Sequence, residues 1–512
     1  MHFLKTHAWT FALASLAALA IYFFEGHAGL NLWDEGYLWY GSQRVVLGEM
    51  PMRDFYAYDP ARYYITAAVM RGLHSDGIIA VRIASYAFQA LGIWTLLIAL
   101  KRDHTHISQW NTLLVLILVL LWMFPRHKLF DVSTTIMVVA ALAAWIRQPD
   151  SRRTLLLGAM VGLAACMGRN HGLYAAVAAA LALLVVPQAP ISQKWKSFAV
   201  LAVGGTLGYS PMLLAMAFSP GFASSFFESI RMLFEIGATN LPISVPWPWL
   251  VRIDSGPGVL LRDVAIGLNF VFLLAFPLLA LVYLWKSRQG LRPHASITIA
   301  AVLVALPYAH FAISRADVSH LAQGAIPAII AAATWNWPSR KSTWAVGAVL
   351  LLNALVVMLP MHPGWQARKE SWKEIRIVGG EQLVLPPSTA MEIGALQKTV
   401  EHYAGSSNPF VATPYWPGAY ALMRRKSPMW EIYSLVPHGP TFQLAEIQRI
   451  RSAHPALILL QDYEIDGMPQ RRLAANQPLL YQYLVTEYAS LPADPSLPSV
   501  RILIPPATQT AD

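Results

Sequence analysis

Two adjacent carboxylates, Asp34 and Glu35, directly follow the first hydrophobic segment of the chain. A carboxylate beside a membrane boundary is expensive to hold near hydrocarbon, and such residues are usually functional. A carboxylate can also take a proton from a hydroxyl group, as a general base does. We therefore predict that both residues are catalytic, with Asp34 as the base and Glu35 as a supporting neighbour. An alternative stays open, because an acidic residue at the start of a helix can also serve as its N-cap.

The carboxylates open a long loop that is rich in aromatic and arginine side chains. These are Trp39, Tyr40, Arg44, Arg53, Tyr56, Tyr58, Arg62, Tyr63 and Tyr64. Aromatic faces stack on sugar rings, and a guanidinium group binds phosphate oxygens in a bidentate manner. This composition suits a sugar held beside a phosphate, and Arg62 is a candidate phosphate ligand.

Composition and hydropathy determine the class of protein. The chain has 512 residues, of which 56% are hydrophobic and 13% charged, and its mean hydropathy is +0.44. Apolar runs long enough, or nearly so, to cross a bilayer recur along the first 360 positions. They cover residues 8–24, 77–100, 111–125, 132–146, 154–167, 173–186, 198–218, 263–285, 295–312, 321–336 and 343–360. The pattern predicts a polytopic α-helical membrane protein with about 11 transmembrane helices, although paired short runs can instead be re-entrant.

Basic residues in alternate loops predict the orientation. Besides Lys5, they are Lys101, Arg102, Arg147, Arg152, Arg153, Lys194, Lys196, Lys286, Arg288, Arg292, Arg340 and Lys341. The positive-inside rule then places the N-terminus in the cytoplasm and the carboxylate loop outside. The first run is interpreted as an uncleaved span of a multi-pass protein of the inner (plasma) membrane. The net charge of +10 is thus a topology signal, and no nucleic-acid partner is expected.

Three short turns on the predicted outer side carry basic residues against this rule. Their candidate phosphate ligands are Arg126, Lys128, Arg169, His171, Arg315 and His320. Cations that converge at headgroup depth suit the phosphate of a lipid. The alternative is that each arginine reaches toward lipid headgroups or pairs locally, as Arg315 can with Asp317.

The chain resembles the GT-C superfamily of integral-membrane glycosyltransferases. The resemblance covers about the first 330 residues and is most specific from Trp33 to Tyr64. Within the superfamily it is similar to the bacterial branch related to protein O-mannosyltransferases and lipid A aminoarabinose transferases. The resemblance implies transfer of a sugar from a polyprenyl-phosphate carrier, with Asp34 matching the first-loop aspartate that is the proposed catalytic base of the family. It also implies a second acid after the third span, which Asp131 matches in position. A second acid would either orient the acceptor or hold a divalent ion.

One stretch departs from the aminoarabinose-transferase branch. That branch has Lys-Pro-Pro-Leu late in the first loop, where this chain has Asp59-Pro60-Ala61-Arg62-Tyr63-Tyr64. The missing lysine argues against aminoarabinose as the sugar.

The chemistry also follows from the residues themselves. A phosphate-linked sugar already has a leaving group, so one carboxylate base suffices, and in-line attack inverts the anomeric carbon. The expected partners are a polyprenyl-phosphate-linked sugar, a glycan, lipid or protein acceptor, and membrane lipids. No cofactor is required and no ligand spacing demands a metal, although a divalent ion is compatible with the acids.

Residues 361–512 are predicted to form an extracytoplasmic soluble α/β domain that follows a transmembrane GT-C-like catalytic domain at 1–360. Strands are expected at Leu383–Leu385, Phe410–Ala412, Ala456–Leu460 and Val500–Ile504. Helices are expected at Met391–Tyr403, Ala445–Ala453 and Arg471–Leu484.

Two other functions stay open. A polytopic transporter or flippase of lipid-linked sugars also presents cations outward, but such proteins usually place charge at mid-membrane and often contain repeated halves. A phosphate- or acyl-group transferase would need a metal cluster or an activated nucleophile. Glycosyl transfer accounts best for the carboxylate loop.

Overall fold

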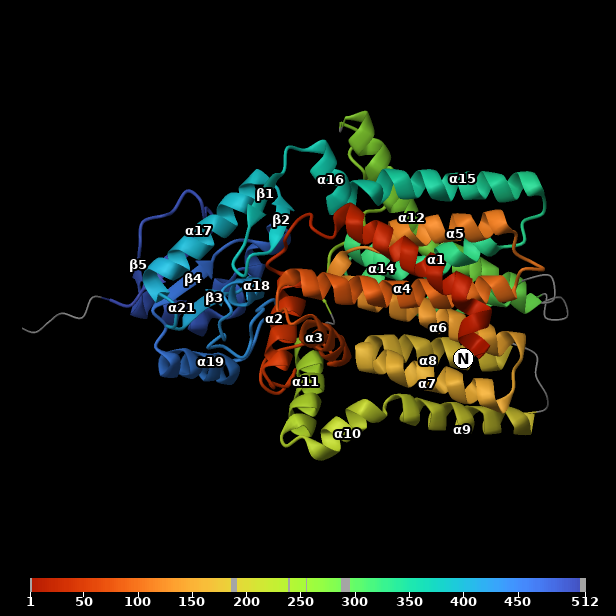
Figure 1. The fold of residues 1–512 in the computed structure, drawn as a ribbon, viewed down its shortest axis with the longest axis horizontal. Helices are drawn as coiled ribbons and strands as arrows, with labels where there is room; N and C mark the ends of the chain where they lie inside the picture. Colours follow the sequence, from red (N-terminus) through yellow and green to blue (C-terminus); the bar gives the residue numbers. More distant parts are fainter. Residues whose placement is uncertain (1, 186–190, 238–239, 255, 287–294, 507–512) are drawn as a thin grey trace, which may run out of the picture. The chain divides into compact units, whose positions relative to one another are not determined.

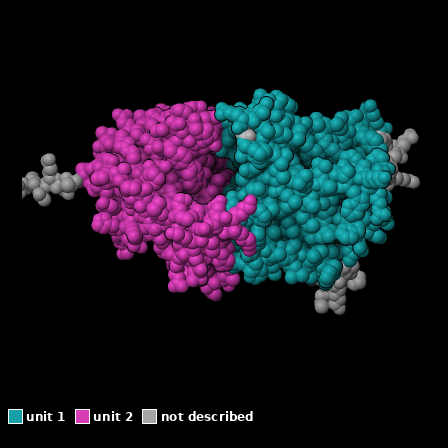
Figure 2. Space-filling view, turned by 90° about the horizontal axis from the view of Figure 1, so that it is seen from above, with its two compact units in different colours: residues 1–26, 82–220, 242–366 teal, residues 27–81, 221–241, 367–512 magenta. Residues whose placement is uncertain are grey.

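The computed structural model describes residues 2–185, 191–237, 240–254, 256–286 and 295–506. The chain divides into two compact units, which Figure 2 colours separately. Unit 1 comprises Met1–Gly26, Arg82–Pro220 and Pro242–Gln366, and unit 2 comprises His27–Val81, Gly221–Leu241 and Ala367–Asp512.

Unit 1 is helical in the described residues (Figure 1). Its helices are α1 (His2–Glu25), α4 (Ile78–Arg102), α5 (Gln109–Trp122), α6 (Leu129–Arg147), α7 (Ser151–Met167), α8 (Arg169–Val185), α9 (Ile191–Gly208), α10 (Ser210–Phe218), α12 (Pro257–Lys286), α13 (Ser296–Ser314), α14 (Val318–Thr334) and α15 (Arg340–Val357). A short 3-10 helix, η1 (Arg126–Lys128), precedes α6.

Every apolar run identified in the sequence falls on one or two of these helices. Within the described residues, six helices are long and apolar enough to cross a membrane, or seven if the bent pair α9 and α10 forms one span. Helices α5, α8 and α14 are apolar but shorter. A polytopic membrane fold is therefore confirmed, and the count of 11 spans stays a prediction.

Small residues let the helices of unit 1 pack closely. In α14, every residue from Leu321 to Thr334 is buried. A Cβ atom on Gly162 of α7 would lie 2.2 Å from the Gly205 carbonyl oxygen of α9, so only glycine allows this approach. Small residues spaced four apart commonly mediate such contacts between membrane helices.

Unit 2 combines the first loop with the C-terminal region. Its helices are α2 (Asp34–Val46), α3 (Ala61–Leu73), α11 (Phe222–Ile236), α17 (Pro387–Ala404), α18 (Pro417–Leu422), α19 (Pro440–Ala453), α20 (Leu473–Asn476) and α21 (Pro478–Glu487). Helix α16 (Pro363–Lys369) spans the boundary between the two units.

The strands of unit 2 form two sheets. In the first, β1 (Lys373–Arg376) pairs antiparallel with β2 (Gln382–Leu385). The second has the order β3-β4-β6-β5 and consists of β3 (Phe410–Thr413), β4 (Leu457–Gln461), β5 (Ala489–Ser490) and β6 (Val500–Ile504). Only β3 and β4 are parallel. Each strand predicted from the sequence overlaps one of these strands, while a separate domain at 361–512 outside the cytoplasm stays a prediction.

The first loop is held to the C-terminal region by close backbone contacts. A Cβ atom on Gly36 of α2 would lie 2.5 Å from the Gly418 Cα of α18. The Gly418 amide donates to the Leu32 carbonyl over 2.8 Å, and the Gln43 side chain donates to the Ala421 carbonyl over 3.1 Å. These contacts fix α2, and with it the carboxylate pair, against residues far along the chain.

Candidate active site

Asp34 is the first residue of α2, and it is partly exposed. The Asn31 side-chain oxygen accepts hydrogen bonds from the backbone amides of Trp33 (2.8 Å) and Asp34 (3.0 Å). The amides at the start of the helix are thus hydrogen-bonded to the Asn31 side chain, and Trp33 occupies the N-cap position. The capping alternative for Asp34 is therefore wrong.

The Asp34 carboxylate accepts a hydrogen bond from the Tyr433 hydroxyl at 3.3 Å. Burial raises the pKa of Tyr433 well above its usual range, and the negative charge of Asp34 acts in the same direction. The hydroxyl therefore keeps its proton at neutral pH and remains a donor to the carboxylate. No local sequence signal identifies Tyr433, which comes from the C-terminal region.

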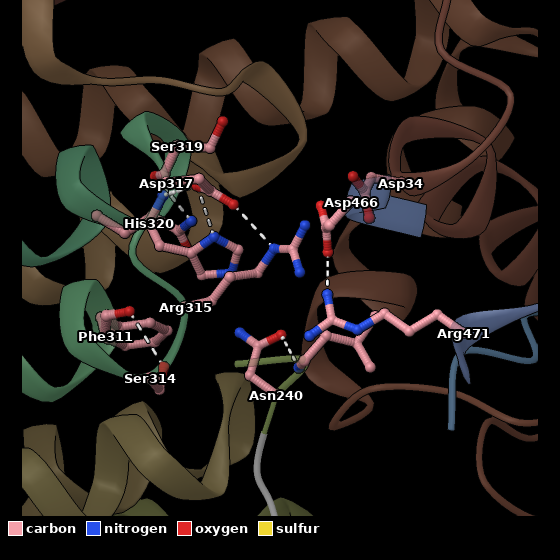
Figure 3. A network of polar contacts seen from close by, with 12 residues as sticks. Asp34, Asn240, Phe311, Ser314, Arg315, Asp317, Ser319, His320, Asp466 and Arg471 are labelled. Carbon is pink, nitrogen blue, oxygen red and sulfur yellow. Dashed lines mark hydrogen bonds and ion pairs between the residues drawn. The ribbon is translucent and has the colours of Figure 1, made fainter. Parts of the chain in front are cut away.

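Aromatic rings surround the backbone next to Asp34. The Trp33 ring stacks on Tyr415 with centroids 5.4 Å apart and planes at 16°, and it lies 5.1 Å from the ring of Tyr463. Tyr415 is fully buried, and its hydroxyl donates to the Arg471 carbonyl over 2.7 Å. Arg471 in turn forms an ion pair with Asp466, seen with Asp34 in Figure 3. The partly exposed Trp33 ring, at the residue before Asp34, is thus held in place by its packing on Tyr415 and Tyr463.

Glu35 and Arg62 are both buried in unit 2. The Glu35 carboxylate accepts from the Asn31 amide at 3.5 Å, so it helps to shape the turn that precedes α2. The Arg62 guanidinium lies 5.1 Å above the ring of Tyr58, which is 37% exposed. The contact holds the guanidinium against the aromatic ring by a cation–π interaction.

In unit 1, Asp131 and His171 form a buried pair between α6 and α8. The His171 Nε2 atom lies 2.8 Å from the Asp131 carboxylate, and Nδ1 lies 3.2 Å from the Tyr308 hydroxyl. With the proton on Nε2, Nδ1 accepts from Tyr308. The sequence named both members of the pair but neither their contact nor Tyr308, because the three residues come from different helices.

Arg126 lies in a second buried cluster. Its guanidinium donates to the Glu25 carbonyl over 2.8 Å. The Glu25 carboxylate binds His362 at 2.9 Å and accepts from the Tyr86 hydroxyl at 3.0 Å. The contacts among Glu25, His362 and Tyr86 were not predicted from the sequence, because Glu25 is the last residue of an otherwise apolar span. Lys128 and Arg169 are partly exposed and lie at the starts of α6 and α8.

Arg315 and His320 meet at Asp317 (Figure 3). The Arg315 Nε donates to the Asp317 carboxylate over 2.8 Å, and His320 Nδ1 lies 2.9 Å from the same group. Asp317 is also the N-cap of α14, where it accepts from the His320 amide. Burial opposes the charge of Asp317, but hydrogen bonds from His320 and the nearby positive charges hold its pKa below its usual range. Local pairing, the alternative for Arg315, is therefore present in the structure.

The predicted residues are divided between the two units. Unit 2 contains Asp34, Glu35 and Arg62, and unit 1 contains Arg126, Lys128, Asp131, Arg169, His171, Arg315 and His320. Among the described residues, no group of three or more His, Cys, Asp or Glu side chains is arranged to hold a metal ion.

Solved structures of two enzymes are among those that the chain resembles. ArnT from Cupriavidus metallidurans, solved with undecaprenyl phosphate bound, aligns over 98% of both chains with a TM-score of 0.53 and 14% identity. The Archaeoglobus fulgidus oligosaccharyltransferase in its apo form aligns over 94% of this chain and 73% of that one, with a TM-score of 0.45 and 12% identity. The same enzyme tethered to an acceptor peptide aligns over 96% of this chain and 74% of that one, with a TM-score of 0.42 and 11% identity.

No protein-family model matches the chain, and no curated protein matches it. The likeness to ArnT extends over nearly the whole chain, and at this identity it concerns the fold alone. The chain therefore has a fold similar to that of ArnT, which agrees with the resemblance inferred from its sequence.

Proposed function

We propose that the protein transfers a sugar from a polyprenyl-phosphate carrier to an acceptor hydroxyl on the outer face of the membrane. One observation carries the proposal: a partly exposed carboxylate, Asp34, accepts a hydrogen bond from Tyr433 and directly follows Trp33, whose ring stacks on Tyr415. The arrangement supplies a base and an aromatic surface at one place, in a chain with the fold of ArnT.

The reaction needs one proton transfer. Asp34 takes the proton of the acceptor hydroxyl as its oxygen attacks C1 of the sugar. The bond between C1 and the phosphate oxygen breaks, polyprenyl phosphate leaves, and the anomeric carbon is inverted. Tyr433 keeps the carboxylate oriented, and Glu35 supports the turn that presents it.

The donor class rests on two arguments. ArnT was solved with undecaprenyl phosphate, and this chain carries cations in its predicted outer turns. Lys128 and Arg169 are the strongest phosphate ligands of this set because they lie at helix N-termini, whose partial positive charge also attracts anions. Arg126, His171, Arg315 and His320 are the other proposed phosphate ligands of unit 1, and Arg62 is a separate candidate in unit 2.

The topology belongs to the same proposal. The basic residues of alternate loops support a cytoplasmic N-terminus in the inner (plasma) membrane, with the first loop outside. With eleven spans, residues 361–512 would also lie outside. The acceptor is a glycan, a lipid or a protein, and Asp131 is proposed to orient it. The absence of lysine at the Asp59–Tyr64 stretch argues for a sugar other than aminoarabinose.

A product analysis distinguishes a transferase from a flippase. Purified protein in detergent receives a radiolabelled polyprenyl-phosphate sugar and a cell-envelope extract as the source of acceptors. A transferase releases free polyprenyl phosphate and moves the label to a new product on thin-layer chromatography. A flippase leaves the bond between sugar and phosphate intact, and an intact donor after incubation with every envelope fraction would refute the proposed activity.

The phosphate site has a separate test. Replacing Lys128 or Arg169 by Ala should weaken donor binding about 10- to 100-fold, since a hydrogen bond to a charged group contributes about 1.5–3 kcal/mol. Arg169→Lys should restore only part of the affinity, because lysine lacks the bidentate geometry of arginine. If both Ala variants bind the donor with wild-type affinity, Lys128 and Arg169 do not bind its phosphate.

A further inference from the structure

Helix α11 (Phe222–Ile236) has three distinct faces. One face is buried within unit 2 and consists of Phe222, Phe226 and Met232. Two further stripes of residues are at least partly accessible, one apolar and one polar.

The apolar stripe comprises Ala223, Phe227, Ile230 and Phe234. Their spacing of four, three and four residues places them on one side of an α-helix. Phe227 is 63% exposed and Phe234 is 83% exposed. Two phenylalanine rings that protrude this far are a surface that burial would stabilise, at about 25 cal/mol per Å² of apolar area.

The polar stripe comprises Ser224, Glu228, Arg231 and Glu235. Each follows a member of the apolar stripe by one residue, so the two stripes run side by side, about 100° apart around the helix axis. Arg231 lies 2.5 Å from the Glu228 carboxylate and 3.6 Å from that of Glu235. The polar side of the helix therefore carries charges that pair along its length.

Chain connectivity indicates what covers the apolar stripe. Helix α10, half of the bent apolar pair, ends at Phe218, and only three residues separate it from Phe222. On the other side the chain enters α12 at Pro257, an apolar helix of 30 residues. Both ends of the segment thus continue into apolar helices, and the three-residue link keeps the start of α11 within about 14 Å of the end of α10.

The rest of this segment has the composition of a membrane interface. Trp249 is 69% exposed and Leu250 is 66% exposed. Tryptophan is enriched where headgroups meet acyl chains. A soluble partner would not require both ends of the segment to be anchored, so the features together favour lipid.

We propose that α11 is an interfacial helix, which inserts Phe227 and Phe234 among the acyl chains of the outer leaflet and keeps the Glu228–Arg231–Glu235 stripe in the headgroup layer. Amphipathic helices of this kind lie in the plane of the membrane, with the apolar face about 5–10 Å deep. The role is independent of glycosyl transfer. It makes this outer segment a lipid-contacting part of the protein.

Spin labelling tests the depth of each stripe. Cys166 is the only cysteine and is buried, so single cysteines can be labelled with a nitroxide in the full chain in phosphatidylethanolamine–phosphatidylglycerol vesicles. The unsubstituted protein controls for labelling of Cys166. The variants Phe227→Cys and Phe234→Cys report on the apolar stripe, and Ser224→Cys and Glu235→Cys are the matched controls on the polar stripe.

Labels on the apolar stripe should collide with oxygen, which dissolves in acyl chains, and be shielded from a water-soluble nickel chelate. Labels on the polar stripe should show the reverse. Equal nickel access on both stripes would place the helix in water, and low access to both reagents at Phe227 and Phe234 would mean that protein covers them. Either result overturns the proposal. Size-exclusion profiles and unfolding temperatures confirm that each labelled variant is folded.

Discussion

The Tyr433 hydroxyl donates a hydrogen bond to the Asp34 carboxylate at 3.3 Å, across 399 positions of the chain. The contact connects the first loop to the C-terminal region within one compact unit. The Gly36–Gly418 approach and the hydrogen bond from the Ser427 amide to the Tyr40 hydroxyl (3.0 Å) reinforce the same connection. The C-terminal region thus helps to position the proposed base.

Asp34→Asn should lower turnover by about 100- to 10,000-fold, the usual effect of losing a general base. Asparagine keeps the size of the side chain but cannot take the proton, so donor binding should hardly change. Glu35→Gln should cost less. The matched control is Asp54→Asn, which removes a carboxylate of the same loop that pairs with Arg53 at 2.8 Å. Wild-type turnover in Asp34→Asn would place the base elsewhere, and Asp131 would be tested next.

Tyr433→Phe should lower turnover by about 10- to 100-fold, because it removes one hydrogen bond to a charged group. The fall should appear in kcat, with the KM for the donor nearly unchanged, since the ring and its packing remain. Tyr415→Phe is the control, as its hydroxyl donates to the Arg471 carbonyl and not to Asp34. If Tyr433→Phe and Tyr415→Phe lower kcat equally, the Tyr433 hydroxyl has no specific role in positioning Asp34.

The Asp131–His171 pair should stabilise unit 1. Removing one partner of a buried pair typically costs about 3–5 kcal/mol, so His171→Ala should lower the unfolding temperature in detergent. Tyr308→Phe, which removes only the contact to Nδ1, should lower it less. Asp131→Asn retains a hydrogen-bond acceptor for His171. The variant therefore tests the effect of Asp131 on turnover separately from its effect on stability. A variant that unfolds like wild type but turns over slowly would support Asp131 as the second acid, and a wild-type rate would exclude that role.

Glu446 should make stability depend on pH. Burial raises the pKa of its carboxyl to about 7, against the opposing charge of Arg449. Because the folded state holds this proton more tightly than the unfolded state, the free energy of unfolding falls as pH rises from about 4.5 through 7, by at most about 3 kcal/mol. Glu446→Gln should flatten that dependence.

The measurement compares unfolding temperatures at pH 5.5 and pH 8. Wild type should lose more stability than Glu446→Gln between these values, and the exposed Glu487→Gln should behave like wild type. Parallel curves for all three proteins would contradict the effect of burial on this carboxyl.

Reporter fusions check the proposed topology. Alkaline phosphatase, which is active only outside the cytoplasm, should be active when fused near Gly364 or after Asp512 and inactive near Arg102. The reason is the alternation of basic loops along the chain. An inactive fusion at Asp512 would change the parity of the span count and move the C-terminus to the cytoplasm.

The sequence by itself determined the class of fold and the positions of its long apolar helices and main strands, whereas α11, α18, β1 and β5 were not predicted. Each predicted apolar run falls on helix, and each predicted strand overlaps β2, β3, β4 or β6. Hydrophobic runs and their spacing are local properties, since a helix must satisfy its own backbone in lipid whatever it packs against. The candidate base, Asp34, was also identified from the sequence, because two adjacent carboxylates directly after an apolar span are unusual.

Only the tertiary structure decided the partners of these residues. Tyr433 at Asp34, Tyr308 at His171 and His362 at Glu25 each come from segments more than 100 positions away. The Asn31 side chain, rather than that of Asp34, accepts hydrogen bonds from the amides of Trp33 and Asp34 at the start of α2. The geometry of a single turn determines this. Side-chain contacts of this kind depend on how helices and strands meet in space, and the spacing of residues in a single sequence does not encode that arrangement locally.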